Sequence, residues 1–232
     1  MKNYLAFILL LIIISCSSDN HFKINGTFEG NIEDQWIYLS KFMAEDSYSD
    51  SIFMQNGKFQ FSGICGYPEA YVIQNHRDSS LAWFQFYLEP GKITIDLDPN
   101  DWAYGSTVQG GPINEEYNDN FRAPRDEFIR FRDKTLEKIA IADSLQKTEL
   151  KEAMQKASDA DIEKQLEYVR NNPESPISPY LLGSNFFMFP IDEAEIILGS
   201  FSDENRQTAV CISLQEKLDM LKEFSNGSLE TE

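Results

Sequence analysis

The stretch WFQFYLEPGKITIDL, residues 83–97, decides the fold of the N-terminal part of the chain. Apolar residues alternate with other residues on both sides of its centre, which is the two-residue period of a β-strand. Between the two halves lies EPGK (89–92), in which proline presets φ at one central turn position and glycine accepts a positive φ at the next. The pattern predicts one β-hairpin in the core of an N-terminal β-domain.

Further strand signals follow one another about eight to twelve residues apart. Asn56-Gly57 joins two of them and is the strongest two-residue hairpin turn in the chain, because both residues accept φ > 0. Seven or eight short strands predict an antiparallel β-sandwich over residues 22–111. Besides the two halves of 83–97, the predicted strands are 22–28, 36–39, 50–54, 58–61, 70–73 and 107–109.

The pattern changes at Pro112 from the strand period to a helical one. Apolar residues recur three, four or seven positions apart over 117–139, where Pro124 is expected to interrupt the helix near its start. A second helical stretch covers 145–169. These signals predict that a mainly helical segment, residues 112–224, follows the sandwich, so that the fold class is α+β.

Shorter helices are expected towards the C-terminus, each with a polar residue as its cap. Ser178 is the predicted cap of a helix over 180–187, with Pro179 in its first turn. Asp192 is the predicted cap of a helix over 193–198, and Ser202 that of the last helix. The polar, acidic tail 225–232 is predicted to be disordered. The last helix has a predicted buried stripe formed by Val210, Leu214, Leu218, Leu221 and Phe224.

The first residues have the features of an exported protein. One lysine precedes ten apolar residues at 5–14, a run too short to span a bilayer, which needs about 20 residues. The segment 1–15 is therefore predicted to be a signal peptide. Ile13-Ile14-Ser15-Cys16 matches the bacterial lipobox, so Cys16 is the predicted lipidation site. Acyl chains contribute roughly 0.8 kcal/mol per buried CH₂, and more than one chain gives a lasting membrane anchor.

The composition is strongly acidic, with a formal net charge of −18. This charge argues against nucleic acid and anionic lipid surfaces as partners, because both would repel it. Residues 16–21 form a short polar tether between the lipid and the fold. Ser17 is not the aspartate that retains lipoproteins in the inner membrane, which favours the outer membrane of the cell envelope. A periplasmic and a cell-surface orientation both stay open.

Several motifs of the predicted sandwich occur in a characteristic order: Phe22-x-Ile24-x-Gly26, Ile37-Tyr38-Leu39, Gly57-Lys58-Phe59-x-Phe61, Tyr87-Leu88-Glu89-Pro90-Gly91 and Gly110-Gly111-x-x-Asn114. In this order they resemble an envelope family, domain of unknown function 4369. The helical part, with Asn172-Pro173-x-Ser175, is similar as well, so the resemblance covers roughly 22–224. In that family the domain sits behind a lipoprotein signal. It is usually followed by a helical segment and a thioredoxin-fold domain of the thiol-disulfide oxidoreductase type.

The chain contains no Cys-x-x-Cys motif, so no redox residue can be transferred from the family. What the resemblance implies is an accessory module without its enzyme, with a thioredoxin-fold envelope protein as a candidate partner. We therefore expect a non-catalytic envelope lipoprotein that acts as an interaction module, with neither a cofactor nor a metal.

Two other functions stay open. Aromatic residues are candidates for a platform that binds a glycan or a peptide, unless they belong to the core; they are Trp36, Trp83, Tyr87, Trp102 and Tyr104. The second is a cryptic thiol oxidoreductase activity, for which Cys65 and Cys211 are the candidate residues. A disulfide between them and a buried core thiol are the alternatives, and Cys211 lies on the same helical face as Leu214 and Leu218.

Other motifs have a structural interpretation beside the functional one. DLDPND (96–101) begins like a calcium loop but lacks its glycine and its glutamate, so a turn rich in Asx caps is the alternative. Asp50-Ser51-Ile52 and Asp143-Ser144-Leu145 resemble acceptors of O-linked glycans, or serve as turn and cap residues. His76 lies in a polar loop between Gln74 and Ser80, whereas a catalytic triad draws its members from separate elements.

Overall fold

The computed structural model describes residues 20–28, 30, 33–43, 49–75 and 83–227. The predicted signal peptide, the predicted lipidation site Cys16 and His76 lie outside these residues. Within the described ranges, no helix combines the length and the apolar character that crossing a membrane requires.

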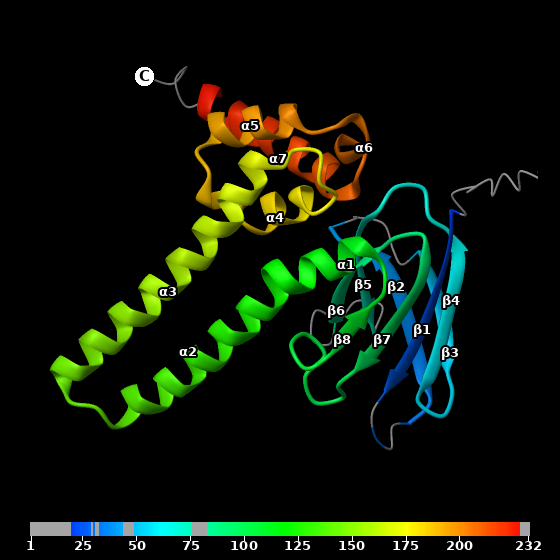
Figure 1. Cartoon of the computed structure of the whole chain (residues 1–232). Helices are drawn as coiled ribbons and strands as arrows, with labels where there is room; N and C mark the ends of the chain where they lie inside the picture. Colours follow the sequence, from blue (N-terminus) through cyan, green and yellow to red (C-terminus); the bar gives the residue numbers. More distant parts are fainter. Residues whose placement is uncertain (1–19, 29, 31–32, 44–48, 76–82, 228–232) are drawn as a thin grey trace, which may run out of the picture.

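Two four-stranded sheets form the predicted sandwich (Figure 1). The first has the order β4-β1-β7-β8 and consists of β1 (His21–Phe28), β4 (Lys58–Ile64), β7 (Gly91–Leu97) and β8 (Thr107–Gln109). The second has the order β3-β2-β5-β6 and consists of β2 (Gln35–Lys41), β3 (Asp50–Met54), β5 (Glu69–Gln74) and β6 (Trp83–Leu88). Apolar side chains of both sheets share one core. The predicted α+β class and the eight strands are confirmed for the part that the structure describes.

The predicted hairpin at 83–97 is wrong, because β6 and β7 belong to different sheets. Both strands bury alternate side chains in the same core, among them Phe86 of β6 and Ile93 of β7. Gly91 has the positive φ that was expected, 113°. The chain nevertheless crosses from one sheet to the other there, so the two apolar faces lie opposite each other. Alternation identifies the buried face of each strand, but it does not distinguish a hairpin from such a crossover.

The crossover also explains the one strand pair that is not antiparallel. β7 enters the first sheet beside β1 and runs parallel to it, with Ile24 opposite Ile93. The turn at Asn56-Gly57 has the predicted positive φ values of 51° and 67°. It closes with two hydrogen bonds between the main chains of Gln55 and Lys58, of 3.2 and 3.0 Å, beyond which β3 and β4 separate into opposite sheets.

The helical segment starts as one long helix in three parts, α1 (Pro112–Tyr117), the π-helical turn η1 (Asn118–Arg122) and α2 (Ala123–Ile141). The interruption predicted near Pro124 is confirmed, because the Ala123 N–H donates to the Asn118 carbonyl five residues earlier. Proline has no N–H and its ring crowds the carbonyl four residues before it, so a wider turn relieves the contact.

α3 (Ser144–Asn171) runs back along α2, and Figure 1 shows the two helices projecting as a hairpin from the rest of the molecule. Asp143 caps α3 by accepting a hydrogen bond of 2.9 Å from the Gln146 N–H. The five remaining helices gather beyond the other end of α3 (Figure 1). They are α4 (Ser178–Ser184), the 3-10 helix η2 (Phe186–Met188), α5 (Ile191–Ser200), α6 (Asp203–Arg206) and α7 (Ala209–Gly227).

Only one of the three predicted cap residues acts as a cap, and it caps a different helix from the one expected. The Ser202 hydroxyl accepts a hydrogen bond of 3.1 Å from the Asn205 N–H, but it caps α6 rather than the last helix. Ser178 and Asp192 lie inside the first turns of α4 and α5. Ser178 instead donates its hydroxyl to the Asn172 carbonyl over 2.6 Å. The local pattern therefore placed these helix starts one or two residues too late.

The buried stripe of α7 is shorter than predicted. Val210, Leu214 and Leu218 are buried, but Phe224 is 75% exposed because the core of the helical segment ends near Leu221. The helix itself continues to Gly227, through the first three residues of the predicted tail. The rest of that tail lies outside the described residues.

Candidate functional site

Strand β6 is covered on both faces, which makes it the joint between the sandwich and the helices. Phe84 and Phe86 point into the sandwich core. On the opposite face Tyr87 enters the core of the helical segment, with its ring centroid 5.2 Å from that of Tyr117. The Tyr117 centroid lies in turn 5.7 Å from that of Tyr180 on α4. The residues between β6 and the helices therefore come from segments far apart in the sequence.

A buried carboxylate fixes where the first helix leaves the sandwich. Glu89 accepts hydrogen bonds of 3.2 and 2.9 Å from the backbone N–H groups of Ile113 and Asn114. The Asn114 amide donates to Glu89 over 2.8 Å and exchanges hydrogen bonds of 2.9 and 2.8 Å with the main chain of Tyr87. These N–H groups lack intrahelical partners at the start of α1, and a carboxylate is favoured there.

Gly111 shows how closely the two segments meet. Its φ is +89°, and a Cβ atom built on it would lie 2.1 Å from Cδ of Glu89. Burial raises the pKa of Glu89, although the hydrogen bonds from Asn114 and Ile113 oppose the shift. The two motifs that contain Glu89 and Asn114 thus form one hydrogen-bonded unit with a structural role.

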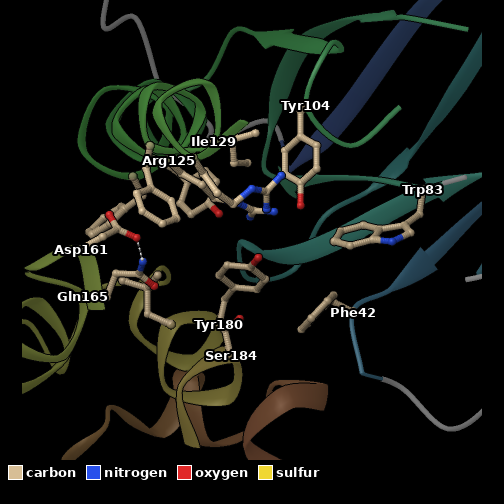
Figure 2. Close-up of a pocket in the computed structure, with 14 residues that line it drawn as sticks. Phe42, Trp83, Tyr104, Arg125, Ile129, Asp161, Gln165, Tyr180 and Ser184 are labelled. Atoms are coloured by element: carbon tan, nitrogen blue, oxygen red, sulfur yellow. Dashed lines mark hydrogen bonds between the residues drawn. The ribbon is translucent and has the colours of Figure 1, made fainter. Parts of the chain in front are cut away.

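A pocket of about 470 Å³ lies beside this joint, between the sandwich and the helices (Figure 2). Its volume falls in the range of about 300–1,000 Å³ that is usual for small-molecule sites. Half of its lining residues are aromatic, and the lining comes from β6, two loops of the sandwich, α1, η1, α2, α3 and α4. The aromatic residues include Phe42, Trp83, Tyr104, Phe121, Phe128 and Tyr180.

Charged groups of both signs line the pocket. Figure 2 shows the guanidinium of Arg125 beside the ring of Tyr104, and its Cζ lies 4.9 Å from the ring centroid. On the far wall Asp161 accepts a hydrogen bond of 2.8 Å from the Gln165 amide. Arg132 also lines the pocket but forms an ion pair of 2.9 Å with Asp133. One end of the pocket is therefore cationic and the other carries an ordered acid.

A small recess of about 10 Å³ continues from the cationic end. It shares Trp83, Tyr104, Tyr117 and Arg125 with the pocket. Gln85, Ala103, Arg122 and Asp126 complete its lining. The Nε2 atom of Gln85 and the Nε atom of Arg122 are buried and have no hydrogen-bond acceptor among the described residues. A buried donor left without an acceptor costs about 1–3 kcal/mol.

Arg122 is held in place by its other contacts. One terminal nitrogen donates to the Gln85 carbonyl, and its Cζ lies 4.5 Å from the ring centroid of Phe84 and 5.6 Å from that of Tyr117. Burial lowers the pKa of Arg122. No carboxylate of the described chain lies within ion-pair distance of Arg122 or of Arg125. The recess therefore offers positive charge and donors without matching acceptors.

The five predicted aromatic candidates separate into three groups. Trp83 and Tyr104 line the pocket. Tyr87 is buried in the core of the helical segment and Trp102 in that of the sandwich, in agreement with the alternative that these aromatic residues belong to the core. Trp36 is 50% exposed on β2 and stacks edge-on against Phe53 at a centroid distance of 5.6 Å. The structure thus brings together two of the five.

Sequence reasoning missed the polar residues of the site, namely Gln85, Arg122, Arg125 and Asp161. One signal was available, because Arg122, Arg125 and Arg132 are three and seven residues apart and share one helical face with Phe121 and Phe128. Gln85 had no such signal, since a glutamine between aromatic strand residues is also typical of a solvent-facing position.

The two described cysteines are free thiols, and the predicted burial of Cys211 is confirmed. Burial, and secondly the carboxylates of Glu69 and Glu89, raise the pKa of Cys65 to about 11. Burial raises the pKa of Cys211 to about 11 as well. Both environments oppose formation of the thiolate, which is the reactive form of cysteine.

The remaining acidic motifs act as turn and cap residues. Asp98 accepts a hydrogen bond of 2.8 Å from the Asn100 N–H, and Asp101 accepts one of 3.1 Å from the Tyr104 N–H. Asp50 accepts a hydrogen bond of 2.7 Å from the Ser51 N–H. Across the described ranges, no three His, Cys, Asp or Glu side chains are grouped so that they could hold a metal ion.

Comparison with known proteins shows a similarity over residues 22–117. No curated protein matched the sequence, and no solved structure matched it either. One family model did match, that of the Domain of unknown function (DUF4369), over residues 22–117. The match covers the sandwich and α1, including the unit formed by Glu89 and Asn114. The resemblance expected from the strand motifs is therefore confirmed over residues 22–117, and the match does not extend beyond α1 into the rest of the helical part.

Proposed function

We propose that this protein is a non-catalytic binding module of the cell envelope, anchored through lipid on Cys16, and that the pocket between the sandwich and the helices holds its ligand. The observation that carries the proposal is a pocket of ligand size next to buried donors without acceptors. Evolved cores rarely leave such donors unpaired. A molecule that enters the pocket and reaches the recess would supply the missing acceptors.

The anchoring part of the proposal rests on the sequence of the first sixteen residues. The joint at Glu89 and Asn114 supports the binding part, because it holds α1, and through it α2, in one orientation against β6. A site assembled from a sandwich and a helical layer keeps its shape only when that joint is rigid.

Thermal unfolding of the full mature chain tests the proposal. The protein would be screened against peptides, glycans, organic acids and amines, and at least one class should raise the melting temperature in a dose-dependent way. In the variant Ser184→Trp, a large side chain is introduced at an exposed position on the pocket wall, and it should abolish that shift. Ala140→Trp, exposed further along α2, is the matched control and should keep it. No shift with any class, or an equal shift in Ser184→Trp, would contradict the proposal.

An accessory role towards a thioredoxin-fold envelope protein is the second candidate. The end of the α2–α3 hairpin favours it, because Leu136, Ile141 and Leu145 are 47, 90 and 70% exposed there. Exposed apolar side chains grouped on one projection are typical of a docking surface. A photo-crosslinking residue at Ile141 should capture a thioredoxin-fold protein in intact cells, and one at the exposed Glu152 should not. Capture of other proteins alone at Ile141 would exclude this role.

A further inference from the structure

Two residues that line the recess beside the pocket each carry a buried hydrogen-bond donor without an acceptor. Gln85 is 5% exposed, and its Nε2 atom points at no acceptor in the described chain. The Nε atom of Arg122 is also buried and has no acceptor in the described chain. The guanidinium of Arg122 packs against the rings of Phe84 and Tyr117. A ligand group that enters it must accept hydrogen bonds.

The charge at this end of the pocket narrows the choice of ligand. Arg125 stands at the junction of pocket and recess and stacks on Tyr104 (Figure 2). Asp126 also lines the recess but lies beyond ion-pair distance of either arginine. Burial raises the pKa of Asp126, and the positive charges of Arg122 and Arg125 oppose that rise. Two guanidinium groups thus share the recess with one acid, in a protein with a formal charge of −18. An anionic group is favoured over a neutral or cationic one.

The recess limits how much of an anionic group can enter it. At about 10 Å³ it has room for about one oxygen atom. A carboxylate can place one oxygen there and leave the other beside Arg125. The aromatic walls of the larger pocket require an apolar or aromatic body attached to that carboxylate.

We propose that the pocket binds an organic carboxylate with an aromatic or apolar body, in which Gln85 and Arg122 donate to one carboxylate oxygen and Arg125 to the other. The inference rests on the proposed binding function and specifies its ligand. The same chemistry is offered by a free acid and by the C-terminus of a peptide that ends in an apolar residue.

Calorimetric titration of the full mature chain separates these cases. The probes are 3-phenylpropionate and its neutral amide 3-phenylpropanamide, followed by the peptide Ala-Ala-Phe with a free and with an amidated C-terminus. Each acid should bind at least about tenfold more tightly than its amide, since hydrogen bonds to charged groups contribute strongly when both partners are desolvated. Binding of 3-phenylpropionate alone identifies a free acid as the ligand, and tighter binding of the peptide identifies a C-terminus.

Arg125→Gln removes one guanidinium from the rim of the recess and leaves the more deeply packed Arg122 in place. It should reduce the preference for the acid over the amide to less than about threefold, while circular dichroism shows an unchanged fold. Arg130→Gln, an exposed arginine on the same helix outside the pocket, should keep the full preference. Equal affinity of acid and amide in the wild type would overturn the carboxylate assignment, and so would an unchanged preference in Arg125→Gln.

The two proposals fail in distinguishable ways. If a neutral glycan or an amine stabilises the protein and loses its effect in Ser184→Trp, the pocket binds a ligand but the carboxylate assignment is wrong. If no acid binds and no class of compound stabilises the protein, water satisfies the buried donors and both proposals are wrong.

Discussion

Asn114 connects three parts of the molecule through a single side chain. It hydrogen-bonds both main-chain groups of Tyr87 on β6 and the carboxylate of Glu89, while its own N–H completes the start of α1. The residue is 1% exposed, so water cannot replace these partners when they are lost. The asparagine of a Gly-Gly-x-x-Asn motif therefore has a positioning role that its sequence context alone does not show.

Replacing Asn114 should test that role directly. Asn114→Ala leaves several buried groups without partners, and we expect it to lower the free energy of unfolding by about 2–4 kcal/mol. Asn120→Ala is the matched control, because that exposed amide makes one local hydrogen bond of 3.1 Å to the Glu116 carbonyl. Asn120→Ala should lower the free energy of unfolding by no more than about 0.5 kcal/mol. Urea denaturation measures both values, and equal costs in the two variants would show that the buried network contributes little.

The thiols give a second prediction at this scale, in the form of a pH dependence. A pKa of about 11, compared with an ordinary value of 9.0, reduces the thiolate fraction of Cys65 and Cys211 about a hundredfold at pH 8. Native protein should therefore react very slowly with a disulfide reagent at pH 8, and the rate should keep rising as the pH approaches 11. Unfolding in urea should release both thiols. Fast reaction of either thiol in the native state at pH 8 would reopen the oxidoreductase interpretation.

Among the elements, the interruption of the helix near Pro124 was predictable and the strand crossover was not. Pro124 removes a helical hydrogen bond whatever surrounds it, so an interruption near it follows from local chemistry. The partner of β7 depends instead on which strand lies beside it in three dimensions, and β1 is some seventy residues away in sequence. Local pattern thus predicts where strands begin and which faces are buried, but it does not predict which sheet they join.

The cap of α3 supports a prediction about the projecting hairpin. Asp143 and Gln146 form a reciprocal capping box, in an exposed segment with little tertiary packing around it. Asp143→Ala should lower the free energy of local unfolding at the start of α3 by about 1 kcal/mol. Amide hydrogen exchange over residues 141–150 should therefore become about fivefold faster. Exchange in β6 should not change, and Glu149→Ala should leave both regions as they are. A change in β6 of the same size would mean that the hairpin unfolds together with the sandwich.

At the scale of the whole molecule, the site is formed by segments that meet only after folding. β6, the loop with Tyr104, the long helix, α3 and α4 each contribute to the pocket. The fold class, the strands and the DUF4369 domain were accessible from sequence because each rests on local pattern or ordered motifs. The pairing of Arg125 with Tyr104 and the unpaired amide of Gln85 depend on how the helices lie across β6, which no local pattern encodes.

Anchoring is also a property of the whole molecule. Cys16→Ser should move the protein from the membrane fraction to the soluble fraction of its cells, because it removes the cysteine to which we propose that the membrane-binding acyl chains are attached. Cys65→Ser changes a thiol that lies within the fold and should leave the protein in the membrane fraction. Fractionation and immunoblotting measure the distribution, and a Cys16→Ser protein that stays with the membrane would contradict lipid anchoring at this residue.

The central claim, that ligand enters the pocket beside β6, can be tested in one spectrum. The chain has three tryptophans, and each gives a separate indole N–H signal in a ¹⁵N-labelled sample. Trp83 lines the pocket, Trp102 is enclosed in the sandwich core and Trp36 is exposed beside Phe53. Titration with the compound that most stabilises the protein should move the Trp83 signal to saturation and leave the other two in place. A shift of the Trp36 signal with the Trp83 signal unchanged would place binding on the outer face of β2 and contradict ligand binding in the pocket.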